Sequence, residues 1–190
     1  MISGVVLAAG TASRFGATKQ IAIVDGKALA QHAIDALSDA GVDEIVVVTG
    51  HDAVKVGSAL TLPANARIVY NPRFKQGQST SLATALHALD DDSEGAIVLM
   101  ADQPGVTADV VRALVARFIA TRMQIVRATY RDGPGPSLLS REIYGEAGHL
   151  TGDVGARELI ASHPEWVEEV EIDEPTPSDV DTPQDLPGYG

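Results

Sequence analysis

Four short apolar runs, each followed by a segment with helical spacing, constrain the fold of this chain more than any other feature. The runs cover residues 2–8, 44–49, 66–70 and 96–100. Continuous runs of this length, rich in Val and Ile, are typical of strands buried on both faces of a sheet. Apolar residues recur every three or four positions over 27–40, 52–60, 79–89 and, behind Thr107 as a helix cap, 108–118. This alternation predicts an α/β fold, a three-layer αβα sandwich with a Rossmann-like, mainly parallel sheet.

The pattern loosens in the last third of the chain. Strands are expected at 125–130 and 137–139, with a loop rich in Gly and Pro between them, and a helix from 151 to about 163. Residues 167–172 alternate apolar and acidic side chains, which predicts a half-exposed strand. Neither an internal repeat nor a linker-like segment is found, so we expect one domain over residues 1–190.

The net charge excludes some classes of partner. The 190 residues include 26 Asp and Glu against 14 Lys and Arg, a formal charge of −12. Such a surface repels nucleic acids and anionic membranes, so we expect neither as a partner. The absence of Cys excludes disulfides, thiolate metal sites and a Cys nucleophile. There is no signal-peptide pattern and no apolar run of the roughly 18 residues that span a membrane, so we expect a cytoplasmic protein.

The turn after the first predicted strand has the composition of a phosphate-binding loop. Small residues at 8–12 let backbone N–H groups approach a ligand closely, and Ser13, Arg14 and Lys19 add a hydroxyl and two cations. The alternative interpretation is a well-packed turn with solvated Arg14 and Lys19. The turn matches neither Gly-x-x-x-x-Gly-Lys-Ser/Thr nor Gly-x-Gly-x-x-Gly, and the second run ends without an acidic residue, which argues against a nicotinamide-dependent oxidoreductase.

Residues 7–19 resemble, without a gap, the signature L-A-A-G-x-S-x-R-x-G-x-x-K of the MobA/MocA-like nucleotidyltransferases. Further segments resemble the family motifs N-P-x-x-x-x-G-x-S-x-S-L at 71–82, D-Q-P at 102–104, G-D-x-G-A-R at 152–157 and D-[IV]-D-T-P-E-D-L at 179–186. The last two motifs point to the MocA-like branch, which includes molybdenum cofactor cytidylyltransferase.

The resemblance implies an enzyme that moves a nucleoside monophosphate from an NTP to a phosphorylated acceptor, with release of pyrophosphate and with Mg²⁺ as cofactor. It favours CTP, with GTP as the alternative, and a molybdopterin-type cofactor as acceptor, with a molybdoenzyme or its chaperone as a further partner. Two alternatives stay open. One is a guanylyltransferase or other NTP transferase acting on a different phosphorylated small molecule. The other is a non-catalytic nucleotide-binding or cofactor-insertion protein.

The resemblance also implies roles for individual residues. Those expected to bind the nucleotide are Leu7, Ala8, Ala9, Gly10, Ser13, Arg14, Gly16, Lys19, Ser79, Ser81 and Gln103. Those expected to act in catalysis are Arg14, Lys19, Asp102 and Asp181, and the two aspartates are expected to hold Mg²⁺.

Several of these residues also have plainer interpretations. Asp102 follows the run 96–100, which places it at the carboxyl end of a strand facing the phosphate loop, but Asp is also common in turns. Asp181 or Thr182 could cap a short helix that begins at Pro183. Ser79, Thr80 and Ser81 could likewise cap the helix at 79–89.

Three residues are assigned to the acceptor side, namely Gly135, Asp153 and Arg157. Gly135 stands where many MocA-like sequences have the His of Gly-His-Pro, in a loop at 132–137 that should border the acceptor, and this departure leaves the acceptor open. Asp153 and Arg157 lie one helical turn apart and could instead pair with each other. On the nucleotide side, the Cβ of Ala9 would narrow the base pocket, which favours a pyrimidine.

Overall fold

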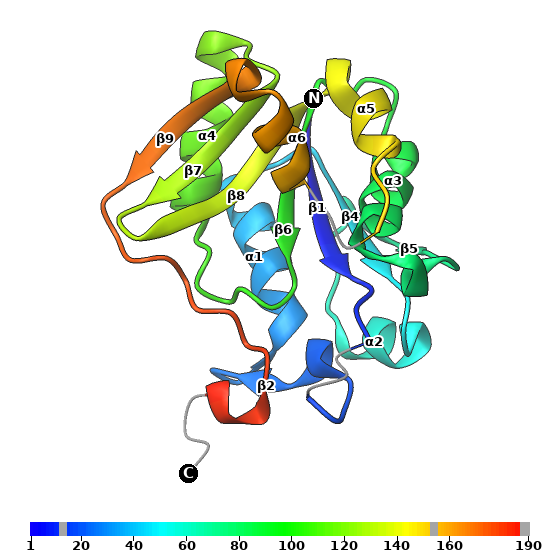
Figure 1. Ribbon diagram of the computed structural model, residues 1–190. Coiled ribbons are helices and arrows are strands. Elements are labelled where there is room, and N and C mark those ends of the chain that lie inside the picture. Colours follow the sequence, from blue (N-terminus) through cyan, green and yellow to red (C-terminus); the bar gives the residue numbers. More distant parts are fainter. Residues whose placement is uncertain (12–14, 153–155, 187–190) are drawn as a thin grey trace.

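A seven-stranded sheet runs through the computed structural model, which describes residues 1–11, 15–152 and 156–186 (Figure 1). Its strands, in the order in which they lie, are β5 (Ala66–Tyr70), β4 (Glu44–Thr49), β1 (Ile2–Ala8), β6 (Gly95–Met100), β8 (Gly133–Ser140), β7 (Ile125–Tyr130) and β9 (Val167–Ile172). The strands from β5 to β6 are parallel, as are β7 and β9, whereas β8 is antiparallel to both of its neighbours. The predicted α/β fold with a mainly parallel sheet is confirmed.

Helices cover both faces of the sheet. α1 (Leu29–Ala40) and α4 (Ala108–Thr121) pack on one face, and α3 (Gln78–Ala88), α5 (Tyr144–Gly148) and α6 (Ala156–Ser162) pack on the other (Figure 1). The remaining elements are α2 (Ala53–Ala59), the two-stranded ribbon of β2 (Ile23–Val24) and β3 (Lys27–Ala28), and the 3₁₀ turns η1 (Lys19–Ile21), η2 (Phe74–Gln76), η3 (Arg141–Ile143), η4 (Pro164–Trp166) and η5 (Pro183–Asp185). No helix in the described part of the chain is long and apolar enough to cross a membrane.

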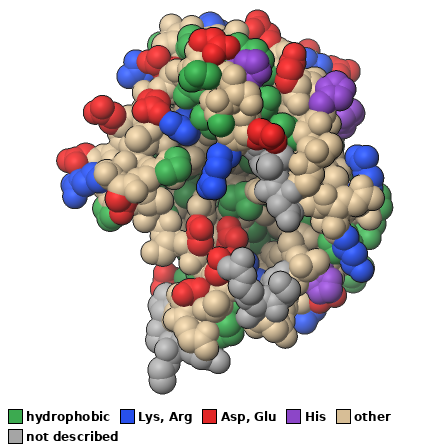
Figure 2. Space-filling model, viewed as in Figure 1, with side chains coloured by type: hydrophobic (Ala, Val, Ile, Leu, Met, Phe, Trp, Pro, Cys, Tyr) green, Lys and Arg blue, Asp and Glu red, His purple; other side chains and the backbone are tan. Residues whose placement is uncertain are grey.

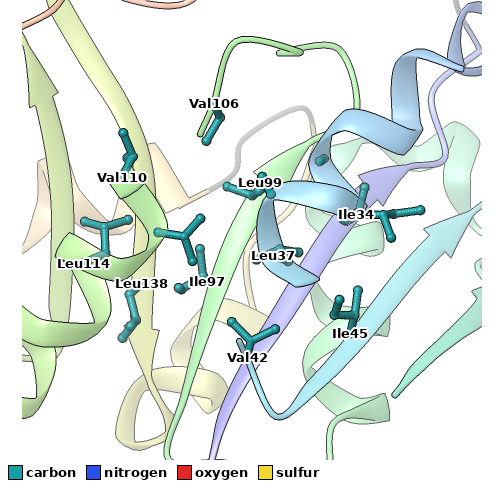
Figure 3. Packing of buried hydrophobic residues seen from close by; sticks show 14 of the residues in the cluster. Ile34, Leu37, Val42, Ile45, Ile97, Leu99, Val106, Val110, Leu114 and Leu138 are labelled. Atoms are coloured by element: carbon teal, nitrogen blue, oxygen red, sulfur yellow. The ribbon is translucent and has the colours of Figure 1, made fainter. Parts of the chain in front are cut away.

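The core between the sheet and the first helix layer depends on a close approach at Gly4. Leu37 of α1 is fully buried and packs over β1, in the layer of side chains that also includes Ile97 and Leu99 of β6 (Figure 3). A Cβ at Gly4 would lie 2.7 Å from Cδ1 of Leu37, so only a glycine lets the helix sit this close to the strand. This contact fixes how closely α1 packs on β1.

The local signals at the helix ends act as expected. Thr107 caps α4, its hydroxyl accepting a hydrogen bond from the N–H of Val110 at 3.5 Å. α1 ends at Gly41, whose φ of +78° is a left-handed conformation that suits glycine.

The interpretation of residues 132–137 as a loop is wrong, because Gly133–Ser140 form strand β8. Prolines interrupt a ladder, which is why the sequence pattern favours a loop. Here the pairing of β8 with β6 ends at Ser137, and the register against β7 shifts between Arg127 and Thr129. Pro136 lies at this shift, and Pro134, opposite Thr129, lies beyond the end of the β6 ladder. The short helix α5 and the β2–β3 ribbon were also not expected from the sequence.

The carboxyl ends of β1, β4, β5 and β6 meet at one edge of the sheet, since these strands are parallel. In Figure 1 this is the lower edge, where α2, β2 and the C-terminal segment gather. Ligands of open α/β sheets bind outside this edge.

We predict that Leu37→Ala lowers the free energy of unfolding by about 2–5 kcal/mol, because it opens a cavity beside Gly4 that the strand cannot fill. Urea denaturation of the purified variant measures the change. Ile119→Ala is the matched control, since this side chain on α4 is 56% exposed and its loss should cost less than about 1 kcal/mol. Equal losses in the two variants would contradict the packing described here.

Candidate active site

A cavity of about 210 Å³ opens at the carboxyl edge, between the end of β1 and the end of β6. Its lining includes Leu7 and Gly10 from the first turn, Lys19 and Gln20 from η1, and Asp102 after β6. In the space-filling view the face is hollowed at its centre, with acidic side chains gathered on one side of the hollow and basic side chains on the other (Figure 2). The cavity combines cationic and anionic groups in a protein whose net charge is strongly negative.

Lys19 lies between two carboxylates in this cavity. Its Nζ is 2.8 Å from Oδ2 of Asp102 and 3.0 Å from Oδ1 of Asp181. The lysine side chain is only 12% exposed, against 22% for Asp102 and 48% for Asp181. Burial by itself would lower the pKa of Lys19, but the hydrogen bonds and charges of the two aspartates outweigh it, so the pKa of Lys19 is raised. The ammonium is therefore held in its charged form between two anions.

Asp102 is positioned by strand pairing on one side and by the C-terminal segment on the other. The N–H of Ala101 donates to the carbonyl of Leu7 at 3.2 Å, which extends the β1–β6 ladder to the residue before Asp102. The carbonyl of Asp102 then accepts a hydrogen bond from the N–H of Val180 at 2.9 Å. This second bond ties the C-terminal segment to the end of β6 and brings Asp181 to the cavity.

Two further features hold Asp181 in place. Val180 is buried in a small apolar cluster with Val24 and Leu29, which anchors the segment against β2 and the start of α1. The carboxylate of Asp185 accepts hydrogen bonds from the N–H groups of Asp181 and Thr182, at 2.9 and 2.7 Å, and from the hydroxyl of Thr182. The backbone bonds from Thr182 and Asp181 lower the pKa of Asp185.

The capping alternative therefore applies to Thr182 and not to Asp181. Thr182 is the N-cap residue of η5 and forms a reciprocal capping box with Asp185. The side chain of Asp181 is turned instead toward Lys19.

The neighbours of Lys19 anchor its backbone, and sequence reasoning missed both of them. The hydroxyl of Thr18 donates to Oδ2 of Asp52 at 2.5 Å, and Nε2 of Gln20 donates to the carbonyl of Gly10 at 2.8 Å. Both side chains are almost completely buried, each 4% exposed. Thr18 thus contacts the residue before α2, Lys19 contacts the two aspartates of the cavity, and Gln20 contacts the first turn. No local sequence signal marks Thr18 or Gln20, because Asp52 is 34 residues from Thr18, and the path of the turn between Gly10 and Gln20 is not set by a local pattern.

The first turn contributes fewer residues to the described cavity than the sequence predicted. Leu7 and Gly10 line it, whereas Ala8 and Ala9 are buried within the strand end, 1% and 5% exposed. Gly16 has a left-handed φ of +72°, which makes glycine the suitable residue there. The predicted Ser13, Arg14 and Asp153 lie outside the described residues.

The serines of α3 are structural in their contacts. Asn71, itself fully buried, donates from Nδ2 to the hydroxyls of Thr80 and Ser81 at 2.9 and 3.0 Å. Ser79 is fully buried, and its hydroxyl has no hydrogen-bond partner among the described residues. The N-cap of α3 is Gly77, so the prediction that one of these side chains caps the helix is wrong. Neither Ser79 nor Ser81 lines the cavity that contains Lys19.

The other predicted binding residues lie around the site but outside the cavity lining. Gln103 donates from Nε2 to Oδ1 of Asp179 at 2.8 Å, so its amide holds the C-terminal segment. Arg157 is exposed on α6. Gly135 lies in β8, where a Cβ would be 2.5 Å from the ring of Tyr130, so this position has no room for the His of the family pattern.

A family model described as the MobA-like NTP transferase domain matches residues 4–167. The match covers most of the chain, which therefore belongs to the MobA-like NTP transferase domain family. The sheet and its helix layers have the nucleotide-diphospho-sugar transferase type of fold, which solved structures of much lower identity share at TM-scores of 0.76.

Individual relatives are similar over nearly the whole chain. A homologue of Mycobacterium tuberculosis Rv0371c from Mycobacterium sp. strain JC1 is 32% identical, with a TM-score of 0.84, over 95% of this chain and 90% of that one. The solved complex of Rv0371c from M. tuberculosis H37Rv with manganese is 29% identical, with a TM-score of 0.80, over 94% and 91% of the two chains. A curated relative, the bifunctional protein GlmU of Methylibium petroleiphilum, is 28% identical over 167 residues, which is 85% of this chain and 36% of that protein. The chain spans about a third of the length of the curated relatives it matches.

We predict that Gln20→Leu weakens nucleotide binding about tenfold, or about 1.4 kcal/mol, because the Gly10 carbonyl loses its donor and the first turn loses its tether. Isothermal titration calorimetry with CTP and GTP measures the affinity of the variant for each nucleotide, and a thermal melt shows whether the variant is folded. Gln124→Leu is the control, a half-buried glutamine at the amino end of β7. Unchanged affinity in Gln20→Leu would show that this tether has no part in binding.

Proposed function

We propose that the protein is a metal-dependent nucleotidyltransferase, which joins a nucleoside monophosphate from an NTP to a phosphorylated acceptor and releases pyrophosphate. The observation that supports this most directly is the contact of Lys19 with Asp102 and Asp181, beside the small-residue turn at the carboxyl edge. Membership of the MobA-like NTP transferase domain family supports the same class of reaction.

The reaction needs positioning and charge neutralisation more than covalent chemistry by the protein. A phosphate oxygen of the acceptor attacks the α-phosphorus of the NTP, the bond to the bridging oxygen of the β-phosphate breaks, and pyrophosphate leaves with that electron pair. The roles we propose are for Lys19 and Arg14 to hold the triphosphate and for backbone N–H groups near Gly10 to approach its oxygens. Substrates held in line in this way react without an enzyme nucleophile.

The donor set of the cavity fits a hard divalent cation. Asp102 and Asp181 present carboxylates to one point, and the described residues include no group of three or more side chains that could hold a metal by themselves. Mg²⁺ is usually held by one or two carboxylates together with substrate phosphates and water, which matches this set. The manganese complex of Rv0371c also supports a divalent metal in this family. When bound, the cation would neutralise charge that develops on the phosphate oxygens.

The substrates we propose in particular are CTP and a molybdopterin-type phosphorylated acceptor. The support for CTP is the resemblance of residues 8–10 to the cytidylyl branch, where a Cβ at Ala9 would narrow the base pocket. The support for the acceptor is the resemblance of residues 152–157 and 179–186 to the MocA-like branch. GTP is the alternative nucleotide, and a different phosphorylated small molecule is the alternative acceptor. A non-catalytic nucleotide-binding protein would release no pyrophosphate.

We predict that Asp102→Asn and Asp181→Asn each lower turnover by about 100-fold or more. Each removes a carboxylate charge that would hold the metal, and the metal would contribute several kcal/mol of transition-state stabilisation. A pyrophosphate-release assay with CTP or GTP and candidate acceptors measures the rate. Asp109→Asn is the matched control, because this aspartate on α4 is 88% exposed and pairs only with Arg112 among the described residues. Turnover that survives in both site variants would contradict the assignment.

We also predict that the wild-type protein uses CTP more efficiently than GTP, and that Ala9→Gly shifts the ratio of kcat/KM values toward GTP by about threefold or more. The reason is that removing one methyl group widens the base pocket, and a single methyl contributes a modest discrimination. The ratio is measured by competition between the two nucleotides. Equal use of GTP by the wild-type protein would show that Ala9 does not select the base.

A further inference from the structure

The ammonium of Lys19 lies where a cation shared by Asp102 and Asp181 is expected. Nζ is within 3.0 Å of an oxygen from each carboxylate, and the lysine is the most buried of the three side chains. An ammonium and a divalent cation repel each other, and they compete for the same carboxylate oxygens. The two carboxylate oxygens that Nζ contacts therefore cannot hold Lys19 and a metal at the same time.

We propose that Lys19 is an internal counter-ion that competes with the divalent metal for Asp102 and Asp181 until an NTP binds. The triphosphate attracts the ammonium of Lys19 away from the aspartates, and the carboxylates that it leaves then accept the metal. This inference rests on the proposed function, because it takes the NTP as the ligand that displaces the lysine. It adds a coupling between the two ligands, because tight binding of the metal requires that the NTP has first displaced Lys19.

The surrounding structure restricts the movement to the side chain of Lys19. Thr18 is tied to Asp52 and Gln20 to Gly10, so the backbone of η1 is held on both sides of the lysine. A lysine side chain has a flexible stem of four carbons, so its ammonium can change partners without a backbone shift. Gly10 and Thr11 line the same cavity as Lys19, so a triphosphate on the first turn is within reach of the ammonium.

The coupling is reciprocal by thermodynamic linkage. If the NTP raises the affinity for the metal by removing Lys19 from the carboxylates, the metal raises the affinity for the NTP by the same factor. Loss of Lys19 should therefore have opposite effects on the two ligands measured separately. It should strengthen the binding of metal alone and weaken the binding of nucleotide alone.

The test is a titration with Mn²⁺ alone, without nucleotide, followed by electron paramagnetic resonance. Lys19→Met should bind Mn²⁺ at least about tenfold more tightly than the wild-type protein, a coupling of ordinary size for linked sites. In EDTA, the same variant should bind CTP and GTP at least about tenfold more weakly in calorimetry. Lys27→Met is the matched control, since Lys27 also pairs with an aspartate, Asp35, but is 53% exposed and lies outside the cavity.

Two further variants make the result specific. Asp102→Asn in the Lys19→Met background should abolish the gain in Mn²⁺ affinity, which would place the metal at this carboxylate. Lys19→Gln replaces the methionine variant if a thermal melt shows that the latter is unfolded, because its amide can still donate to an aspartate.

The outcomes separate this inference from the proposed function. Equal Mn²⁺ affinity in wild-type protein and Lys19→Met overturns the counter-ion role, whatever the enzyme activity is. A gain in Mn²⁺ affinity that equals the gain in Lys27→Met also overturns it, because it would report only the change in net charge. Absence of nucleotide binding and pyrophosphate release in the wild-type protein would instead overturn the proposed function.

Discussion

The site depends on a single electrostatic constraint, which is that two carboxylates placed near each other require a cation. Asp102 and Asp181 come from distant parts of the chain, and Lys19 from a third. Removing the ammonium would leave two like charges in a partly buried cavity, a costly arrangement unless another cation replaces it. The lysine thus stabilises the apo site with the same carboxylates that the reaction is proposed to use.

The C-terminal segment has a larger part in this arrangement than its place after the last strand indicates. The family model matches residues 4–167, and Asp181 lies beyond that match. Burial of Val180, its hydrogen bond to the carbonyl of Asp102 and the capping box of η5 together hold the segment against the end of β6. The position of Asp181, for which we propose a role in catalysis, is thus built by packing and hydrogen bonds in a short irregular segment.

The strands and helices that form the sheet were predictable because their signals are local. Runs of Val and Ile and helical periodicity act over a few residues, Thr107 marks the start of α4, and Gly41 marks the end of α1. The prediction of a loop at residues 132–137 was wrong for the opposite reason. Whether a Gly- and Pro-rich segment joins a sheet depends on which neighbours pair with it, and β8 is inserted between β6 and β7 with its prolines beyond the β6 ladder. The packing of Tyr130 against Gly135 could not be predicted from the sequence either, since it arises only once β7 and β8 lie side by side.

The sequence by itself determined the class of fold, the small-residue turn with Lys19, and the position of Asp102 at the end of a strand, because each follows from residues close together in the chain. Only the tertiary structure decided that Asp181 meets Lys19, that Thr182 and not Asp181 caps η5, and that Gln20 tethers Gly10. It also decided that the hydroxyl of Ser81 is held by Asn71 and turned away from the cavity. The physical reason for the contact of Lys19 with Asp181 is that it joins segments 162 residues apart, which strand order and the burial of Val180 bring together. The other contacts join residues closer in the chain, but which of the possible partners a polar side chain takes depends on how the turns pack, which local pattern does not show.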